Sequence, residues 1–396
     1  MGIGNFFKDL LPLLSPQSLV KQFELSPEGV VIADISALVY HLGKCLPKEM
    51  GHRLLHMVPT KQMKGKFVFV SDNDKLPLPQ KDLARANRPR TERMQQRIIQ
   101  LHDTCFELDN GIRLTEPLGA TDVMISNRTA LFAYLKDFLR RTRIADSEVL
   151  VQMHHDSDAP EADIAIAHRI SEHKASFYLI RTDDADVPAL LCCRFRQQLL
   201  EKEFNIVVDR GSNRPDRYVS VGQLAQDLER RRITNDMFLG LCFCAGTDFV
   251  FKQWLSAKVG TPQMIARLIS KRHLLDTLNL REPQDFDTFV KELTMKAGDS
   301  RKPVSMKLKR MDTTVVPWDY IQFNFEYWLP QTPQAHPKPR LQPQSEEKDR
   351  AIPLLTLPSS CTEVPRASKA RFLAPLSPIL CSLEDSHLVA LGNIDQ

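Results

Sequence analysis

Five short apolar runs alternate with helical patterns through the first 210 residues, and this alternation restricts the fold more than any other feature. They are VVIADIS (30–36), KGKFVFVSD (64–72), EVLVQM (148–153), ASFYLIRTDD (175–184) and FNIVVDR (204–210). Continuous apolar runs of this length are typical of strands that are buried on both faces. Strands alternating with helices predict an α/β fold, in which a mainly parallel central sheet is flanked by helices.

The helical patterns show apolar residues at helical spacing or begin with residues that favour a helix start. Residues 81–143 are also mostly helical in pattern and polar. The clearest predicted helices are NFFKDLLPLL (5–14), ALVYHLGKCL (37–46), PEADIAIAHRISEH (160–173, with Pro160 in its first turn) and ITNDMFLGLCFCAG (233–246, buried and capped near Asn235).

The length of 396 residues suffices for one large domain or two ordinary ones. We expect a folded domain over residues 1–330, with an N-terminal region of about 1–110 and an internal region of about 145–275. Residues 331–396 hold nine of the 26 prolines and show no hydrophobic periodicity. They predict a largely disordered, Pro-rich tail, whose few apolar segments could dock protein partners.

Charge, cysteine spacing and hydropathy exclude several classes of protein. A net charge of +4 does not by itself indicate a nucleic-acid partner. The eight cysteines form no CxxC pair and no zinc-type spacing, which indicates a reducing compartment, and Cys242 and Cys244 lie in an apolar run as expected for core residues. The longest apolar stretch, MFLGLCFCAG, is too short to cross a bilayer, and the N-terminus lacks a secretory signal pattern, so neither secretion nor a membrane partner is expected.

Acidic residues recur at or just after the predicted strands and helices. Ligands of α/β sheets bind at the carboxyl ends of the strands, so these side chains are expected to meet at one edge. Crowded carboxylates are costly unless cations lie between them, and carboxylate oxygens are the ligands that Mg²⁺ prefers. Any one of them alone would more often be a turn or helix cap. The residues are Asp34, Asp72, Glu161, Asp163, Asp184, Asp186 and Asp248.

The order and context of these motifs carry a family resemblance. The chain opens MGI, Asp34 lies six residues before Tyr40, and PEADIA, RTDDAD and AGTDF follow in that order. This set resembles the flap endonuclease/XPG family of structure-specific 5′ nucleases over roughly residues 1–275, and the compact core is also similar to shorter viral branches of that family. The resemblance implies a PIN-like 5′ nuclease fold.

The resemblance also implies two Mg²⁺ ions, with Mn²⁺ as a substitute. Asp34 and Asp72 would face one ion, beside Glu161 and Asp163. The family usually has Glu-Ala-Glu where this chain has Glu-Ala-Asp, and Asp-Gly-Lys-Pro-Pro where it has SDNDKLPLP, so Asp74 is an alternative to Asp72. The site would be completed by Asp184, Asp186 and Asp248.

Nucleic-acid contacts are implied at three places. Residues 81–97 carry six basic and two acidic residues, and the family has a basic helix here that contacts the scissile phosphate, although a solvated charged helix is the common alternative. Tyr40 would stack on a base or be a half-buried helix aromatic. In AKVGTPQMIARLI the DNA-gripping loop of the family keeps Gly260 but has Lys258 where the first glycine belongs. The basic residues on one helical face are Lys81, Arg85 and Arg88, with Arg90 as an alternative because Pro89 interrupts the helix.

The function implied by the resemblance is Mg²⁺-dependent hydrolysis of phosphodiester bonds in flapped or branched DNA, with a nuclear location and a cytoplasmic one as the alternative. The start MGIGNFF and the segment LCFCAGTDF are also similar to 5′→3′ exoribonucleases, which makes RNA the second candidate substrate. A non-enzymatic scaffold that keeps the fold is the third candidate. It ranks last because carboxylates crowded into a site without purpose would repel one another.

Overall fold

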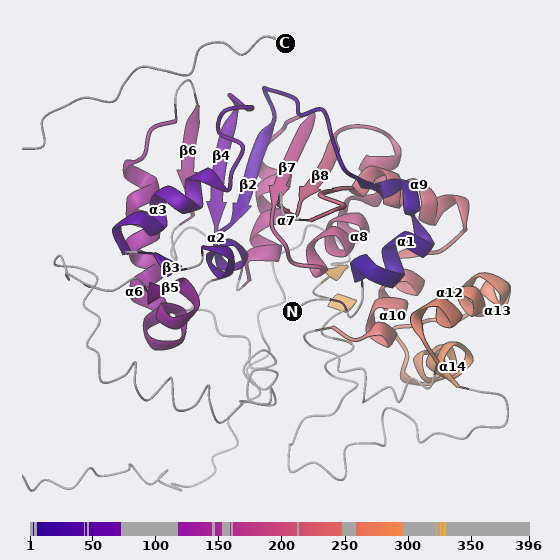
Figure 1. Cartoon of the computed structure of the whole chain (residues 1–396). Coiled ribbons are helices and arrows are strands. Elements are labelled where there is room, and N and C mark those ends of the chain that lie inside the picture. The colour runs from indigo at the N-terminus through magenta and orange to yellow at the C-terminus, as the bar shows by residue number, and fades with distance from the viewer. Residues whose placement is uncertain are drawn as a thin grey trace, which may run out of the picture. The chain divides into compact units, whose positions relative to one another are not determined.

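The structure is a computed structural model of the whole chain (Figure 1). It describes residues 3, 6–42, 44–45, 47–72, 118–144, 147–152, 159, 161–211, 214–247, 259–295, 322, 325–326 and 328–329. All of them belong to the first of two units of the chain, Met1–His336, and the second unit, Pro337–Gln396, lies outside the described residues. The disordered tail and the boundary at residue 330 therefore stay predictions.

A seven-stranded, mostly parallel sheet lies at the centre of this unit (Figure 1). Its strands are β1 (Leu19–Val20), β2 (Val30–Asp34), β4 (Lys66–Val70), β6 (Glu148–Val151), β7 (Phe177–Arg181), β8 (Asn205–Asp209) and β9 (Tyr218–Ser220), in the spatial order β1-β9-β8-β7-β2-β4-β6. β2 pairs in parallel with both β4 and β7, and β6 and β8 extend these pairs in parallel. The five predicted strands and the α/β class are confirmed.

The sheet ends on one side in antiparallel pairs that the sequence did not predict. β9 pairs antiparallel with β8, and β1 pairs antiparallel with β9. These strands have two and three residues, too few for a clear alternation of apolar and polar side chains. A separate two-stranded sheet joins β3 (Lys44–Cys45) and β5 (Leu118–Gly119).

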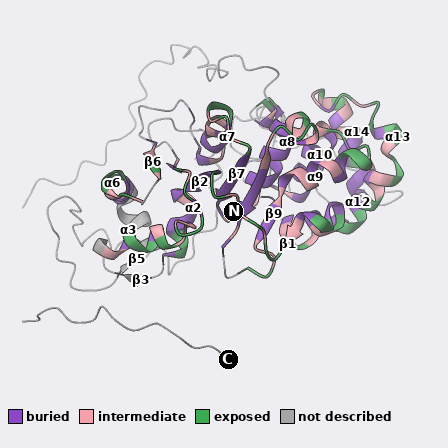
Figure 2. Ribbon diagram, turned by 90° about the horizontal axis from the view of Figure 1, so that it is seen from above, coloured by how far each residue is buried: buried purple, intermediate pink, exposed green. Residues whose placement is uncertain are grey.

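Helices cover both faces of the sheet, and alternate residues of β2 point to the two sides. Val30 and Ile32 belong to one core cluster, with α7 to α10 and the helices after them, whereas Val31 and Ala33 belong to a second cluster with α2, α3 and α6. The buried strands form the centre of Figure 2. The helices are η1 (Phe6–Leu10), α1 (Leu11–Leu14), η2 (Pro16–Ser18), α2 (Ile35–Leu38), η3 (Val39–His41), α3 (Pro47–His56), α6 (Ala120–Arg141), α7 (Ala162–Glu172), α8 (Asp186–Leu200), α9 (Val221–Arg230), α10 (Asn235–Ala245), α12 (Thr261–Ser270), α13 (Arg272–Leu275) and α14 (Pro283–Thr294).

Three helix boundaries differ from the predictions. The helix expected over 37–46 starts earlier, at α2, and η3 ends it at His41, before the poor helix former Gly43. α7 begins at Ala162 after the N-cap Glu161, so the first turn does not contain residue 160. α10 begins at Asn235 rather than at residue 233, and its cap lies near Asn235 as predicted, because the Thr234 hydroxyl accepts the Met237 N–H at 3.2 Å.

The predicted burial of Cys242 and Cys244 is confirmed, and both are 0% exposed in α10. Burial raises the pKa of Cys242 well above its usual range, and it raises the pKa of Cys192 in α8 to about 12. These thiols are therefore protonated at neutral pH and act as small core residues rather than nucleophiles.

The described residues of the aromatic segment WDYIQFNFEYW (318–328) include two that pack in the core. Phe325 and Trp328 are 1% and 0% exposed. The Phe325 ring lies 5.3 Å from Phe243 of α10 and 6.2 Å from Phe286 of α14, both edge to face. The Phe325 ring therefore packs against α10 and α14.

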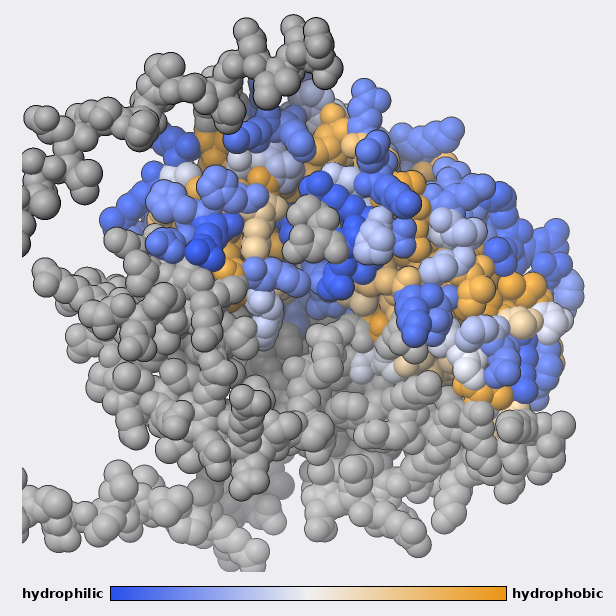
Figure 3. Space-filling model, viewed as in Figure 1, coloured by the Kyte–Doolittle hydropathy of each residue, from blue (hydrophilic) through white to orange (hydrophobic). Residues whose placement is uncertain are grey.

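Among the helices that the structure describes, none combines the length and the apolar character needed to cross a bilayer. On the face seen in Figure 3, hydrophilic residues cover most of the described surface, with smaller hydrophobic areas between them.

Candidate functional site

The first candidate site lies where the strand order of the sheet reverses. From β2 the chain proceeds to β4 and β6 on one side, and then to β7 and β8 on the other. The loops after β2 and β7 therefore lead away from each other, and ligands of α/β sheets commonly bind at the carboxyl ends of two such strands. Asp34 is the last residue of β2, and Asp184 follows β7 by three residues.

Asp34 is the central carboxylate of this edge. It is 4% exposed, and burial raises its pKa from 3.8 to about 8. The negative charge of Asp72 is the next largest cause, and Asp184 and Asp163 raise the pKa further, against a lowering effect of the Ala37 N–H. Three of the other predicted acidic residues are thus close enough to repel the charged form of the buried Asp34 carboxylate.

Hydrogen bonds hold Asp34 in place. Its Oδ1 accepts the Ala37 N–H at 3.1 Å, which caps α2, and its Oδ2 accepts the Thr182 hydroxyl at 3.2 Å. Thr182 directly follows β7 and is fully buried, so the ends of the two strands at the reversal are joined through this carboxylate. The orientation of Asp34 is therefore fixed by groups on both strands.

Asp72 joins the end of β4 to the start of α7. Its N–H donates to the Ser36 hydroxyl at 3.0 Å, and its Oδ1 accepts the Ala162 N–H at 3.1 Å. The latter bond lies at a helix N-terminus, where a negative charge is favourable. Glu161, the N-cap of α7, is 8% exposed, and Asp163 is in the first turn. Asp72 is thus the residue that the structure brings to this edge, while Asp74 lies outside the described residues.

Asp184 lies two residues before α8, and Asp186, the first residue of α8, has a structural contact. Asp184 Oδ1 accepts the Asp186 N–H at 3.1 Å. Asp186 is 4% exposed, and its Oδ1 accepts the Ile3 N–H at 2.6 Å. It does not appear among the main causes of the raised Asp34 pKa. The carboxylate of Asp186 therefore holds the N-terminal segment against α8.

We expect the substitution Asp186→Ala to lower the free energy of unfolding by about 1.5–3 kcal/mol, the usual contribution of a buried hydrogen bond to a charged group. Asp186→Asn retains a carbonyl oxygen that can accept the Ile3 N–H, so most of the loss should be absent in this control. Urea unfolding in a buffer without divalent cations measures both variants. Equal stability of Asp186→Ala and the wild type would contradict the contact.

The remaining predicted site residues fall into two groups. Tyr40 lies in η3 and is 58% exposed, so the prediction of a half-buried ring is wrong and the ring is accessible. Gly260 is the N-cap residue of α12, and its N–H donates to Gln263 Oε1 at 3.0 Å. The predicted residues outside the described part of the chain are Lys81, Arg85, Arg88, Arg90, Asp248 and Lys258.

The donor chemistry of this edge suits Mg²⁺, because it consists of carboxylate oxygens whose mutual repulsion a cation would relieve. Burial is the largest cause of the raised pKa of Asp34, and repulsion by Asp72 is the second. As the side chains stand, no group of three or more histidine, cysteine, aspartate or glutamate residues among the described ones could hold a metal ion. Coordination would therefore require the carboxylates to turn toward a common point.

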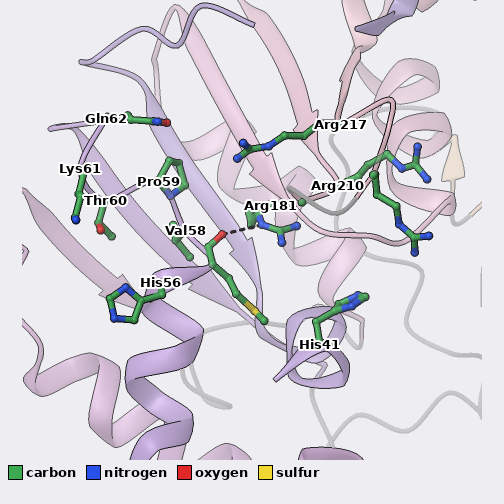
Figure 4. Close-up of a pocket in the computed structure, with 13 residues that line it drawn as sticks. His41, His56, Val58, Pro59, Thr60, Lys61, Gln62, Arg181, Arg210 and Arg217 are labelled. Atoms are coloured by element: carbon green, nitrogen blue, oxygen red, sulfur yellow. Dashed lines mark hydrogen bonds between the residues drawn. The ribbon is translucent and has the colours of Figure 1, made fainter. Parts of the chain in front are cut away.

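A second candidate site, which the sequence interpretation missed, is a pocket of about 560 Å³ (Figure 4). It lies between the segment that follows α3 and the turn that joins β8 to β9. The sequence feature that could have indicated this pocket is DRGSNRPDR (209–217), which has three arginines after a predicted strand. The same composition is typical of an ordinary polar turn. The lining residues are His41, His56, Met57, Val58, Pro59, Thr60, Lys61, Gln62, Arg181, Arg210, Gly211, Arg214 and Arg217.

Asp183 links this arginine pocket to the carboxylate edge, by which we mean the strand ends that carry Asp34, Asp72 and Asp184 together with the start of α7 that carries Glu161 and Asp163. Its Oδ2 lies 2.5 Å from Arg214 Nη2 and 3.4 Å from His41 Nε2. Asp183 is adjacent in sequence to Asp184, whose charge acts on Asp34. A basic pocket and an acidic edge are therefore neighbours along the loop that follows β7.

Comparison of the chain with models of known protein families finds no match, and comparison with curated proteins finds none either. A function for this chain therefore has to be argued from its own residues.

Proposed function

We propose that this chain hydrolyses phosphodiester bonds of nucleic acids with divalent cations bound at the carboxylate edge. The observation that carries the proposal is the pKa of about 8 at the buried Asp34, which is raised by burial and by the charges of Asp72, Asp184 and Asp163. Strongly perturbed carboxylates in a crevice at a strand-order reversal are typical of functional sites.

Several carboxylates of the edge would bind the cations together. Asp34 and Asp72 would be direct ligands, while Asp163, Asp184 and Glu161 would add further oxygens. Two bound Mg²⁺ ions would supply a hydroxide nucleophile and stabilise the leaving oxygen. The Thr182 hydroxyl and the Ala37 N–H would keep Asp34 oriented, and the Ala162 N–H would do the same for Asp72.

The finer assignment is a PIN-like 5′ nuclease fold acting on flapped or branched DNA. Two features support it. The strand order β6-β4-β2-β7-β8 is parallel throughout this part of the sheet, and each of β2, β4 and β7 is followed by, or ends on, a carboxylate of the edge. The order of the acidic motifs resembles that in flap endonucleases and XPG nucleases, and this resemblance indicates flapped or branched DNA as the substrate.

Incubation of the purified full chain with end-labelled flap DNA and Mg²⁺ is expected to give discrete products, which EDTA abolishes. We expect Asp72→Asn to lower the cleavage rate at least about 100-fold, since even residues that only orient a metal ligand contribute up to that factor. The matched control is Asp137→Asn, an exposed carboxylate of α6 paired with Arg141, which should cleave like the wild type.

Single-stranded RNA in parallel reactions distinguishes the substrates. Cleavage of RNA but not of flap DNA would contradict the DNA assignment and leave metal-dependent hydrolysis in place. Absence of cleavage of both substrates with Mg²⁺ and with Mn²⁺, together with calorimetric absence of cation binding, would overturn the proposal and favour a scaffold role.

A further inference from the structure

We propose that the arginine pocket is a binding site for phosphate groups, distinct from the carboxylate edge. None of the described residues that line it is acidic, whereas four are arginines and one is Lys61. The two carboxylates bonded to these arginines are Asp183 and Asp209. With Asp216, whose charge also acts on Arg210, five formal positive charges stand against three negative ones, an excess of two.

Arg181 is the buried cation at the base of the pocket (Figure 4). The residue is 5% exposed, and both of its hydrogen bonds go to neutral acceptors: Nε donates to the Met57 carbonyl at 2.8 Å, and Nη1 donates to the Asp209 carbonyl at 3.0 Å. Burial lowers the pKa of this guanidinium, as expected for a cation held mainly by carbonyls. A buried charge without a dedicated counterion favours an anionic ligand.

The nearest carboxylate is already occupied by another arginine. Asp209 accepts Arg217 Nε at 2.9 Å and Arg217 Nη2 at 2.7 Å, and its Oδ1 also accepts the Gly211 N–H at 2.8 Å. This bidentate pair makes Arg217 a structural partner of Asp209. The charges of Asp209 and Asp183 both act on Arg181, but neither carboxylate accepts a hydrogen bond from it.

Gly211 allows the turn to approach Arg181 closely. A Cβ atom at this position would lie 2.7 Å from Arg181 Nη2, and the residue has φ +101°, which other residues rarely adopt. Because Gly211 carries no side chain, the Nη2 group remains next to the space of the pocket. Glycine at such a position is common where a backbone must come near a ligand.

Arg210 and Arg214 share Asp183 at the mouth of the pocket. Arg214 Nη2 donates to Asp183 Oδ2 at 2.5 Å, whereas Arg210 Nε lies 3.8 Å from Asp183 Oδ1. Arg210 Nε has no hydrogen-bond partner among the described residues, and its guanidinium stacks 3.5 Å above the Phe7 ring. Stacking on Phe7 fixes the plane of this guanidinium and so prepares its donors for a ligand.

Phosphate is the anion that this arrangement fits best. Guanidinium groups bind phosphate oxygens through paired N–H donors, and several converging arginines can share one phosphate or two adjacent ones. A volume of about 560 Å³ lies in the range of small-molecule sites. Among the described lining residues the only aromatic rings are those of His41 and His56, whereas five are cationic, so the pocket should recognise phosphate chiefly through its charge.

The test is calorimetric titration of the full chain with pyrophosphate in a buffer without divalent cations. We expect one molecule to bind per chain, and Arg214→Ala to weaken binding about tenfold, the effect of removing one hydrogen bond between charged groups. Arg214 is exposed, so the variant should fold. The control is Arg141→Ala, an exposed arginine of α6 that also pairs with a carboxylate but lies outside the pocket.

Competition by other phosphates identifies the source of the phosphate. If an oligonucleotide with a terminal phosphate displaces pyrophosphate better than a nucleoside monophosphate does, the natural ligand is the end of a nucleic-acid strand, and the reverse order indicates a free nucleotide. The proposal is overturned if pyrophosphate does not bind at millimolar concentration, or if Arg214→Ala and Arg141→Ala weaken it equally. Since no cleavage is measured, either result is independent of the proposed nuclease activity.

Discussion

Asp34→Asn is expected to abolish hydrolysis and, at the same time, to stabilise the folded chain in the absence of divalent cations. Asparagine is also a good N-cap residue, so its carbonyl can accept the Ala37 N–H as Asp34 does. What it removes is a negative charge that is buried beside Asp72, Asp184 and Asp163. The variant should therefore keep the local structure and lose the direct metal ligand, with a fall in cleavage rate of at least about 100-fold.

The gain in stability has a defined pH dependence. The folded-state pKa of Asp34 is raised from 3.8 to about 8, so the folded chain binds a proton more tightly than the unfolded chain does. The stability that this proton provides is fully present below about pH 4 and is lost as the pH rises to about 8. A shift of one unit corresponds to about 1.4 kcal/mol, so we expect Asp34→Asn to be more stable than the wild type by at least about 2 kcal/mol at pH 8.

Urea unfolding of the wild type and Asp34→Asn at a series of pH values, with EDTA present, measures this difference. The two curves should converge near pH 4 and separate as the pH increases. Asp137→Asn, at an exposed position, should follow the wild type throughout. A variant that is less stable than the wild type at pH 8, or that still cleaves nucleic acid at the wild-type rate, would contradict the assignment of Asp34.

Trp328→Ala is expected to cost about 3–5 kcal/mol of unfolding free energy, the usual loss when a large buried aromatic side chain is removed. Trp328 is 0% exposed and belongs to the same core cluster as Phe325 and the helices after the sheet. Its Nε1 has no hydrogen-bond partner among the described residues. Packing rather than hydrogen bonding should therefore account for its contribution.

The control Trp328→Phe separates these two effects. Phenylalanine retains much of the apolar volume and removes the unpaired N–H, so we expect a loss well below that of Trp328→Ala. Thermal or urea unfolding of both variants gives the comparison. If Trp328→Ala unfolds like the wild type, the aromatic segment does not pack on α10 and α14 as the structure has it.

The strands and the acidic edge could be predicted from the sequence because their signals are local. A buried parallel strand is a continuous apolar run, and Asp34, Asp72 and Asp184 lie at the end of such a run or within three residues of it. In contrast, the contact of Asp186 with the Ile3 N–H joins residues 183 positions apart, which no local pattern encodes. Two aspartates that are two positions apart thus differ in role: Asp184 is a candidate metal ligand, and Asp186 forms a structural hydrogen bond.

The arginine pocket could not be predicted for a similar reason. In the sequence, Arg181 is a single cation at the end of an apolar strand. Arg210, Arg214 and Arg217 lie in a stretch that has the composition of a polar turn. Only the fold shows that Met57, in a distant segment, supplies a carbonyl for Arg181. Short strands such as β9 were missed because three residues carry too little periodicity to be recognised.

The position of β2 at the centre of the sheet has a consequence for synthesis of the chain on the ribosome. β2 is nearly the first strand to be made, but its neighbour β7 comes much later, and Asp34 and Thr182 at their ends are 148 residues apart. At about 5–20 residues per second, roughly 7–30 s pass before that neighbour exists. During this interval one edge of β2, whose first four residues are apolar, has no partner in its own chain, so chaperones that bind extended apolar segments should associate with the nascent chain at β2.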